Sequence, residues 1–592
     1  MKSIRYFVFG SCLFCGLLQT AGSMSAQTLV PESLHITDWQ VVVNNGVAVP
    51  GDTRLFNSYN QPSINVDQLV VFRGRSKGGT GGTGGTGGTG EPAHGIFLRD
   101  MAAGTDLTPL FDRNTKVPQP NDLDAMFTEP PAFPRIDMYS GTVASRGSHQ
   151  PVWQYADTQA GTTGIYTNPF GSLVTGASNL GAVPEFDFFG VRGQNGAIIK
   201  FDVFPGAPAV ANETTIVFKG NYTESVGTES ISRTGVYSRT LTNAPIGDKG
   251  LEPAGGNARV VLIADNNSKI PGTKILFGST APPSAVGYSA VFAGFDNEES
   301  PTEGGIYLAN LNSAQQPPPL TPLIRIGGPV PGEKGAVFTR IGEGLSFDGR
   351  FVAFWGAWGT EVKELVLQCP SDGNKSVIAY CVSLYGNGVD GVPGTVDLGF
   401  HTTVPLHQGI FVYDTRTKNA WAVAKTPNDY ADFVYWNFSG KAPPPQNAPD
   451  AGSGTEGETD GEPARWRSAS FVAVSGLVDG SLRDKLAHAI FKARTGTITD
   501  GAYVDPKDGI YFRQGPDSTV MFTTLVETGM DGTKFDPEAT FVSEVTGLTE
   551  PLPVTTMGIE RDGFRGNAVV LNIGMGNEDA GWAGIYLAKI TK

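Results

Sequence analysis

The sequence predicts an all-β protein in which seven four-stranded sheets close into a ring. Three observations support this: a short signature recurs seven times, strand-length apolar runs surround each copy, and the two ends of the chain supply complementary strands. The signature is a glycine, a β-branched residue and an aromatic residue, found at 95–97, 164–166, 235–237, 305–307, 409–411, 509–511 and 584–586. The first three steps between copies are 69 to 71 residues, which indicates a repeat architecture. About four short strands per unit are typical of the blades of a β-propeller.

The N-terminus has the features of a secretory signal. Lys2 and Arg5 precede an apolar run at 6–18, and small residues near position 26 offer a cleavage site. The run is short for a bilayer span, and no later segment reaches that length. We therefore expect a signal peptide at 1–26, a single mature domain at 27–592, and a secreted or periplasmic protein without a membrane span.

Two cysteines remain after the signal segment, Cys369 and Cys381. In an oxidising compartment they are expected to form a disulfide that closes a small loop. Two free thiols in a reducing compartment are the alternative.

The composition narrows the classes of partner. The chain has 78 glycines and 41 prolines, yet 40% of its residues are hydrophobic, which suits many short strands joined by turns. A net charge of −15 argues against nucleic acid, because phosphate binding needs a basic surface. We expect a monomer whose partner is an extracellular glycan or protein.

The fifth unit shows the strand order most clearly. Apolar runs at 345–347 and 351–356 flank the hairpin signal Asp348-Gly349, and the signature strand and a run at 420–424 follow. The chain also opens on a strand of the outermost type, 39–43, and ends on a signature strand, 584–590. These two strands can pair and remove two exposed sheet edges. The only stretch with helical periodicity is 482–493.

The run 345–354 resembles the Ser-x-Asp-Gly-x-x-x-Ala-Phe repeats of TolB-like propellers. The Val-Pro-Gly, Val-Ala-Phe and Gly-Ile-Tyr elements together resemble a class of secreted bacterial tandem-repeat proteins. The resemblance covers nearly the whole mature chain, implies the fold and carries no catalytic residue. It also implies a strand order A to D in each blade, with the B–C and D–A connections on one face.

Three insertions are expected near 76–92, 359–406 and 440–465. The first is a Gly-Gly-Thr tract, which lacks the Gly-Lys-Ser/Thr of a phosphate-binding loop. The second contains apolar runs at 365–367 and 377–380, interpreted as an added hairpin linked by the cysteines. The third is rich in proline, glycine and acidic residues and is interpreted as a loop.

The histidines are concentrated in one part of the repeat. We find no Gly-x-Ser-x-Gly, no His-Glu-x-x-His and no paired Cys-x-x-Cys in the mature chain. Five of the six histidines fall between the assigned strand B and the next signature strand: His94, His149, His401, His407 and His488. This places them on one face, where His401 and His407 are the best local pair for a ligand. Exposed polar loops that simply collect histidines are the alternative.

A second pattern is the residue before the glycine that ends strand B. It is Arg73, Arg146 and Lys219 in units one to three. In units four to seven it is Ala293, Trp355, Ser475 and Ile573. The three cations form a predicted basic arc, suited to a carboxylate or sulfate on a polymer. Ordinary surface charges, each paired with a local acid, are the alternative.

Acidic loops at 296–299, 387–391 and 531–536 carry oxygen ligands suited to Ca²⁺, although none has EF-hand spacing. Solvated turns are the alternative interpretation. No other cofactor is expected.

Three functional hypotheses remain. The first is a non-catalytic secreted propeller that binds an extracellular glycan or protein on one face, with an acidic glycan as one such ligand. The second is a polysaccharide lyase acting on uronates, in which Arg73, Arg146 and Lys219 neutralise the carboxylate, and His94 or His149, or less readily Tyr166, removes the proton. The third is a structural surface or matrix protein that self-associates.

Overall fold

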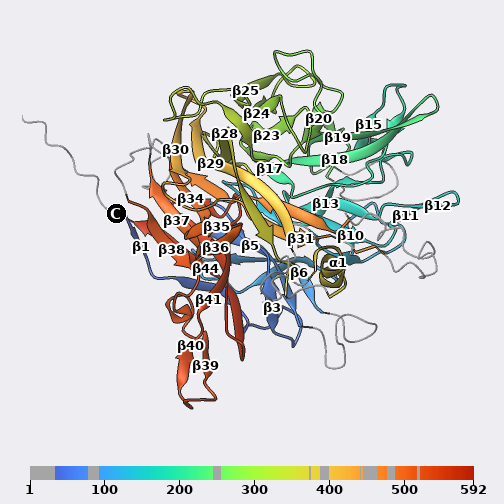
Figure 1. Cartoon of the computed structure of the whole chain (residues 1–592). Coiled ribbons are helices and arrows are strands. Elements are labelled where there is room, and N and C mark those ends of the chain that lie inside the picture. The colour runs from blue at the N-terminus through green and yellow to red at the C-terminus, as the bar shows by residue number, and fades with distance from the viewer. Residues whose placement is uncertain are drawn as a thin grey trace, which may run out of the picture.

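The computed structural model describes residues 34–591 except 78–91, 132, 245–254, 372–374, 387–398, 441, 444–462, 477–486 and 516–520. Within these residues, seven antiparallel sheets of four to six strands surround one axis, and this confirms the predicted seven-bladed β-propeller (Figure 1). The predicted signal segment and the Gly-Gly-Thr tract lie outside the described residues. No helix of the described chain is long and apolar enough to cross a membrane.

Each blade has strands A to D, counted outwards from the axis. Strand C carries the signature and is β6 (His94–Asp100), β13 (Thr163–Thr167), β19 (Glu229–Thr240), β24 (Gly304–Asn310), β29 (Phe400–Asp414), β37 (Asp508–Gln514) and β44 (Gly581–Thr591). Strand B is β5 (Leu69–Ser76), β10 (Val143–His149), β18 (Thr215–Val226), β23 (Ser289–Phe295), β28 (Phe351–Leu367), β34 (His488–Arg494) and β43 (Ala568–Gly576). Strand D is β7 (Thr108–Asp112), β14 (Val174–Ser178), β20 (Val261–Asp265), β25 (Leu320–Arg325), β30 (Asn419–Lys425), β38 (Thr523–Glu527) and, in blade 7, β2 (Gln40–Asn44) with β1 (His35–Ile36).

Strand A is broken into two pieces in most blades. The outer pieces are β3 (Phe56–Tyr59), β8 (Phe127–Glu129), β21 (Ser279–Thr280), β26 (Phe338–Ile341) and β41 (Val554–Gly558). The axial pieces are β4 (Ser63–Ile64), β9 (Arg135–Ile136), β17 (Ala209–Ala211), β22 (Ser284–Val286), β27 (Ser346–Phe347), β33 (Val472–Ser475) and β42 (Phe564–Arg565). Each axial piece contacts those of the two neighbouring blades, so the ring is continuous. We call the residues between the two pieces of a strand A the axial break.

The ends of the chain close blade 7. β2 pairs antiparallel with β44, with Val43 opposite Ile585 and Asn44 opposite Gly584, as the end strands predicted. β1 continues the same edge beside Ile590 and Thr591. The first and last described strands therefore belong to one sheet, and no unpaired edge is left where the ring closes.

Packing explains why the signature recurs. In blade 5 the signature glycine Gly409 lies opposite Gly356 of strand B. A Cβ on Gly356 would meet Phe338 Cε1 at 2.7 Å, and a Cβ on Gly409 would meet Phe411 Cζ at 2.7 Å. The rings of Phe338 and Phe411 meet edge to face with centroids 5.1 Å apart. The two glycines thus leave room for an aromatic pair in the core of the blade.

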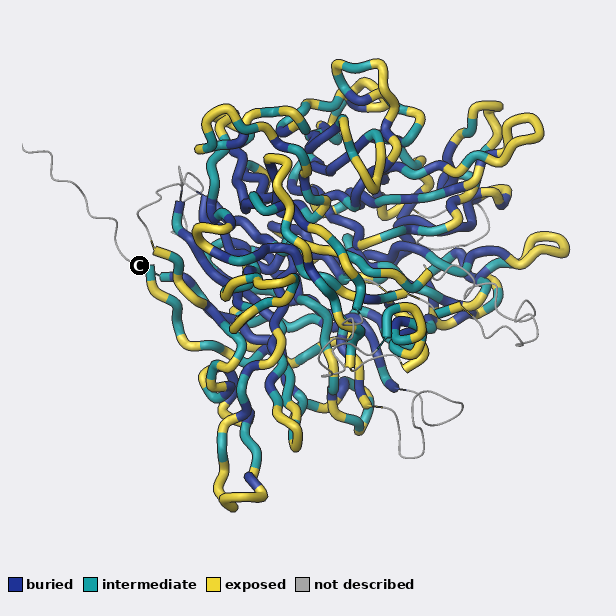
Figure 2. The backbone as a smooth tube through the Cα atoms, in the orientation of Figure 1, coloured by how far each residue is buried: buried dark blue, intermediate teal, exposed yellow. Residues whose placement is uncertain are grey.

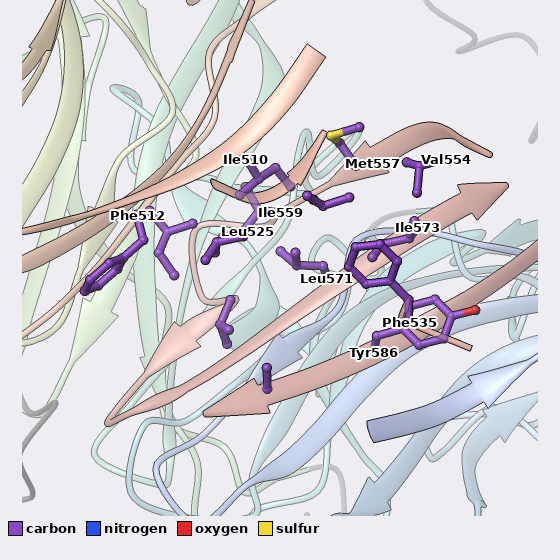
Figure 3. Close-up of a cluster of buried hydrophobic side chains, with 14 of the residues drawn as sticks. Ile510, Phe512, Leu525, Phe535, Val554, Met557, Ile559, Leu571, Ile573 and Tyr586 are labelled. Atoms are coloured by element: carbon purple, nitrogen blue, oxygen red, sulfur yellow. The ribbon is translucent and has the colours of Figure 1, made fainter. Parts of the chain in front are cut away.

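The core continues between blades. Figure 3 shows Ile510 and Leu525 of blade 6 gathered with Leu571 and Ile573 of blade 7, and all four are at most 4% exposed. Buried residues follow the strands, whereas exposed residues gather on connections and hairpin tips (Figure 2). Removal of this apolar area from water stabilises the contact between neighbouring blades.

The sequence interpretation of blade 6 was wrong in two respects. Residues 472–475, assigned to strand B, form the axial piece β33, and strand B is β34. The predicted helix at 482–493 is also absent in its described part, because 488–493 belong to β34. In blade 7, Ile573 lies opposite the signature glycine Gly584. The sequence interpretation had placed Gly574 at this position of strand B, which is one residue too late in the chain.

Blade 5 carries the largest insertion. β28 and β29 are 17 and 15 residues long, and their paired outer parts extend beyond the sheet as a two-stranded ribbon, with α1 (Lys375–Tyr385) between the two strands in the chain. The predicted disulfide is confirmed, because Cys369 and Cys381 are bonded at an S–S distance of 2.04 Å. The prediction of a strand at 377–380 was wrong, since these residues are helical. Val377 and Cys381, four residues apart, bury one helix face against Phe438.

A hairpin from blade 6 packs on this insertion. It consists of β31 (Tyr435–Ser439) and β32 (Arg465–Ala469). The ring of Trp466 stacks on Phe400 of the ribbon with centroids 5.8 Å apart. Arg465 reaches Glu298 of the blade 4 B–C connection at 3.9 Å. The hairpin therefore extends from blade 6 to blade 4 on the face where strands B end, which we call the B–C face.

Smaller elements decorate the connections. They are the hairpins β11 (Trp153–Tyr155) with β12 (Thr158–Ala160), β15 (Val191–Arg192) with β16 (Ile198–Ile199), β35 (Thr497–Thr499) with β36 (Ala502–Val504) and β39 (Thr540–Val542) with β40 (Thr549–Pro551), and the 3-10 turns Asp187–Phe189 and Gly532–Lys534. The β39–β40 hairpin projects away from the body of the propeller (Figure 1).

Candidate functional site

The structure places the three cations of the basic arc at equivalent points. Arg73, Arg146 and Lys219 each lie on strand B opposite the β-branched residue of the signature. By the same register, the corresponding residues of blades 6 and 7 are Lys492 and Asn572, in place of the assigned Ser475 and Ile573. A fourth cation thus occupies this ring position, which sequence reasoning missed because strand B of blade 6 was misassigned.

Arg73 has a carboxylate partner. Its Nη2 lies 2.6 Å from Oε1 of Glu129, which is on the outer piece of strand A in blade 2. The pair spans the contact between blades 1 and 2. For Arg73, the interpretation of a locally neutralised charge is therefore sufficient.

Arg146 and Lys219 have no ion pair among the described residues. The register explains why. Glu129 is paired with Ser148, the residue after the strand B glycine of its own blade. The equivalent residue is Val203 in blade 3 and Ser279 in blade 4. Neither side chain carries a charge, so the carboxylate that neutralises Arg73 has no counterpart facing the next two cations.

Arg146 is also poorly solvated. Its side chain is partly buried, and its Nε has no hydrogen-bond partner within the described part of the chain. Burial lowers the pKa of its guanidinium, because the charged form loses hydration. A partly buried cation without a counter-charge is costly for the fold and is a candidate for binding an anion.

Lys492 differs from these two. Its ammonium lies 4.2 Å from the centroid of the Tyr435 ring. Burial lowers the pKa of Lys492, and attraction to Asp508 partly opposes this. Lys492 is therefore engaged in a cation–π contact. The part of the basic arc that is open to a ligand consists of Arg146 and Lys219.

His94 is the first residue of its signature strand and lies beside this arc. Burial is the main cause that lowers its pKa to about 4, with attraction to Glu129 opposing and repulsion from Arg73 and Arg75 adding to it. Its Nδ1 has no hydrogen-bond partner among the described residues. His94 is thus a neutral imidazole near pH 7, buried between blades 1 and 2.

The structure brings His149 and Tyr166 together. Nε2 of His149 lies 2.5 Å from the Tyr166 hydroxyl, and its Nδ1 lies 2.8 Å from the carbonyl oxygen of Gln150. The exposed fractions are 5% for His149 and 1% for Tyr166. Burial lowers the pKa of His149 to about 4 and raises that of Tyr166 well above its usual range. Both groups are neutral at pH 7 and hydrogen-bonded inside blade 2.

The remaining histidines lie elsewhere. His401 and His407 are on the exposed ribbon, each 2.9 Å from a glutamate, Glu364 and Glu361 respectively. His488 is the first residue of strand B, whereas the prediction placed it after strand B. It therefore lies at the opposite end of its blade. The prediction that five histidines share one face was therefore wrong for His488.

The acidic loops use their carboxylates within the protein. Asp296 accepts hydrogen bonds from Thr302 and from the Glu303 amide, and Asp531 accepts from Thr533. Residues 387–391 lie outside the described residues. Among the residues that the structure describes, no group of three or more His, Cys, Asp or Glu side chains is arranged for a metal ion. The calcium prediction gains no support.

Charged residues fill the axis of the ring. Arg135 of blade 2 lies 2.5 Å from both Glu560 and Asp562 of the blade 7 axial break. Arg565 also pairs with Asp562, and Arg561 lies 3.0 Å from Glu560. We call these five residues the axial network. Three guanidinium groups face two carboxylates, and their ion pairs connect blades across the axis.

One carboxylate borders this network from the B–C face. Glu343 lies in the axial break of blade 5, whose Gly342 amide donates to the Trp355 carbonyl at 2.8 Å. Its side chain reaches solvent, yet desolvation by the surrounding protein raises its pKa, and repulsion from Glu298 adds to this. Attraction to Lys219, Arg561 and Arg465 opposes the shift. We call these five residues the axial mouth. Sequence reasoning missed Glu343, because nothing local marks it.

Comparisons with known proteins add little. No family model matches the chain, and no curated protein matches it. Among solved structures, the chain is similar to the polysaccharide lyase Uly1, with 9% identity, a TM-score of 0.28 and coverage of 54% of this chain and 58% of that one. It is also similar to the AtxE2 isopeptidase in its apo form, with 8% identity, a TM-score of 0.16 and coverage of 89% and 51%. The chain spans less than two thirds of the length of each of these two proteins. Similarities with such low identities and TM-scores carry no argument about activity.

Proposed function

We propose that this protein is an exported β-propeller that binds an acidic extracellular glycan on its B–C face. The observation that carries the proposal is the absence of an ion-pair partner for Arg146 and Lys219 within the described residues, at positions where Arg73 has Glu129. Carboxylate and sulfate groups supply the missing charge, and a guanidinium binds either through two parallel hydrogen bonds.

A repeating ligand suits this arrangement. The two cations occupy equivalent positions of adjacent blades, so a chain with regularly spaced anions can contact both. The net charge of −15 repels polyanions overall, and binding therefore requires a local basic site of this kind. The disulfide between Cys369 and Cys381 is typical of an exported protein and supports export through the 1–26 segment.

Binding assays on the mature chain test the proposal. We expect the protein from residue 27 onwards to bind alginate, pectate or dextran sulfate but not neutral dextran, with affinity that falls as salt rises. Arg146→Gln and Lys219→Gln should each weaken binding. Absence of binding to every acidic glycan at low salt would reject the proposal.

A polysaccharide lyase is the second candidate, and the 2.5 Å contact between His149 and Tyr166 is the observation that favours it. A neutral imidazole hydrogen-bonded to a phenol is a suitable proton-transfer pair. Both side chains are buried, so a uronate would reach them only after blade 2 opens locally. Release of unsaturated uronate products from pectate or alginate, lost in His149→Gln, would establish the lyase. Binding without product release supports the glycan-binding function alone.

A further inference from the structure

Lys363 of the blade 5 ribbon is in direct contact with Asp432 of blade 6. Lys363 is on β28, and Asp432 is in the connection between β30 and β31 that enters blade 6. Nζ of Lys363 lies 3.2 Å from Oδ2 of Asp432 and also donates to the Ala431 carbonyl. The two side chains are 10% and 0% exposed. A buried amine is therefore held against a buried carboxyl group.

The Asp432 carboxyl group is bound at both of its oxygens. Oδ1 accepts from the backbone amides of Phe433 at 2.8 Å and Val434 at 3.0 Å. Oδ2 accepts from the hydroxyl of Tyr503, on the β35–β36 hairpin, at 2.9 Å. Two amides that donate to one carboxyl oxygen form the arrangement that stabilises an oxyanion in acyl transfer. The phenol lies beside the other oxygen, which is the one that must leave.

The surroundings also suit a nucleophilic amine. Burial lowers the pKa of Lys363; attraction to Asp432 opposes this, and repulsion from Arg494 adds to it. Transfer of one proton from Lys363 to Asp432 gives a neutral amine and a carboxylic acid, and it removes two charges that are costly in the protein interior. Burial raises the pKa of Tyr503 well above its usual range, so its hydroxyl keeps a proton to donate.

We propose that Lys363 and Asp432 are a modification site, at which the two side chains form an amide bond that links blade 5 covalently to blade 6. Nζ of Lys363 attacks Cγ of Asp432, and the amides of Phe433 and Val434 bind the oxyanion that forms on Oδ1. The bond from Cγ to Oδ2 then breaks, and Oδ2 leaves as water with the two protons lost by Nζ. Tyr503 stabilises the leaving oxygen through its hydrogen bond. One ammonium and one carboxylate become one amide and one water, so no oxidant, reductant or co-reactant is needed.

The fold supplies the proximity that this reaction needs. Well-oriented groups within one molecule react at effective concentrations of about 10⁵–10⁸ M, which offsets the excess of water that favours hydrolysis. The reacting side chains and their donors come from β28, residues 432–434 and β36 (Ala502–Val504), so the site exists only in the folded protein. The amide would fix the ribbon to blade 6, and it does not depend on glycan binding.

The intact mass of the folded chain, from residue 27 onwards and with its disulfide reduced, tests the proposal. We expect a mass below that of the sequence by one water molecule. Digestion with trypsin should give a branched peptide that joins the segments containing Lys363 and Asp432. The ion pair of Lys425 with Glu333 is an internal control: its atoms are 2.6 Å apart, but its side chains are 26% and 33% exposed. Peptides containing these two residues should remain separate.

Two variants identify the reacting groups. Lys363→Met removes the nucleophile with little change in side-chain length, and it should have the full mass of its sequence. Tyr503→Phe removes the hydrogen bond to Oδ2 and should contain less cross-linked chain than the native protein at equal times after refolding. Equal cross-linking in Tyr503→Phe would contradict the role of Tyr503 in the reaction.

Three results would overturn the proposal. The first is a folded native chain with the full mass of its sequence, and this result needs no variant that folds. The second is a loss of water confined to a single unbranched peptide, as in a succinimide at an Asp-Gly step. The third is the same loss of mass in Lys363→Met. None of these measurements involves a glycan, so the proposed function can stand or fail separately.

Discussion

Asn44 and Asp536 are 492 residues apart in the chain, yet Nδ2 of Asn44 donates to Oδ2 of Asp536 at 2.8 Å. The same carboxylate oxygen accepts from Nε1 of Trp582 at 2.8 Å and from the Tyr586 hydroxyl at 3.1 Å. Asn44 belongs to the first strands of the chain, whereas Trp582 and Tyr586 belong to the last. One buried carboxylate therefore holds both ends of the ring closure.

Replacement of Asp536 should weaken this closure. Asp536→Ala leaves the buried Tyr586 hydroxyl without its acceptor and leaves Asn44 Nδ2 with only the 3.4 Å contact to Glu538 Oε2, and each lost charged hydrogen bond costs about 1–3 kcal/mol. We expect the free energy of unfolding, measured by urea denaturation, to fall by about 3 kcal/mol. Asp531→Ala, which removes an exposed cap of the Gly532–Lys534 turn, should cost no more than about 1 kcal/mol. Equal losses in the two variants would contradict the role of Asp536.

The axial network should be sensitive to loss of one partner. Arg135→Met leaves Glu560 and Asp562 buried near the axis with less compensation, and this should cost about 3–5 kcal/mol of unfolding free energy. Arg259→Met removes an exposed pair with Asp187 and should cost less than about 1 kcal/mol. Denaturation of both variants at the same pH and salt provides the comparison. A small effect of Arg135→Met would mean that water or other groups compensate these acids.

His149 should make stability depend on pH. Its folded-state pKa of about 4 lies below the ordinary value of 6.5, so the unfolded chain binds more protons between these values. Stability therefore falls as pH is lowered from about 6.5 to 4, by about 3 kcal/mol from this residue. His149→Gln preserves a hydrogen-bonding group for Tyr166 but does not titrate. Between pH 7 and 4, this variant should lose about 3 kcal/mol less unfolding free energy than the native protein. Equal losses in the two proteins would refute the claim that His149 has a lowered pKa in the folded state.

The strand B glycines should tolerate no side chain. In Gly356→Ala the new Cβ would lie 2.7 Å from Phe338 Cε1, in a core with no room for displacement. Overpacking of this kind costs about 1–3 kcal/mol. Gly581→Ala is a suitable control, because no atom lies within 4 Å of its Cβ position. Thermal denaturation should show a clear decrease only for Gly356→Ala, and unchanged stability would contradict the packing account of the signature.

The same packing rule explains where the sequence was and was not sufficient. The ring of blades could be predicted because the signature recurs at a readable spacing and, in blades 1 to 5, the strand B glycine opposite it faces a phenylalanine ring. Strand B of blade 6 was misassigned because Ala493, in place of glycine, lies opposite Gly509. In blade 7, Ile573 replaces that glycine opposite Gly584, and the register was displaced by one residue.

The candidate site shows a different limit. Arg73, Arg146 and Lys219 could be predicted as equivalent residues, because strand position is encoded locally. Whether each cation has a partner depends on the next blade, where Glu129, Val203 and Ser279 occupy the facing position. Glu343 and the axial network depend on contacts between blades far apart in the chain, which no local pattern reveals. The helix α1 was missed because a short apolar run fits a strand as well as a helix.

The measurement that tests the central claim most directly is the affinity of oligogalacturonate for two double variants, determined by calorimetry at low salt. Arg146→Gln with Lys219→Gln removes the two cations of the basic arc that have no ion pair among the described residues. Arg416→Gln with Lys418→Gln removes two cations from the turn between β29 and β30, at the opposite end of its blade. We predict that the first pair of substitutions weakens binding by about tenfold or more and the second leaves it nearly unchanged. Equal affinities for the two double variants would contradict the account.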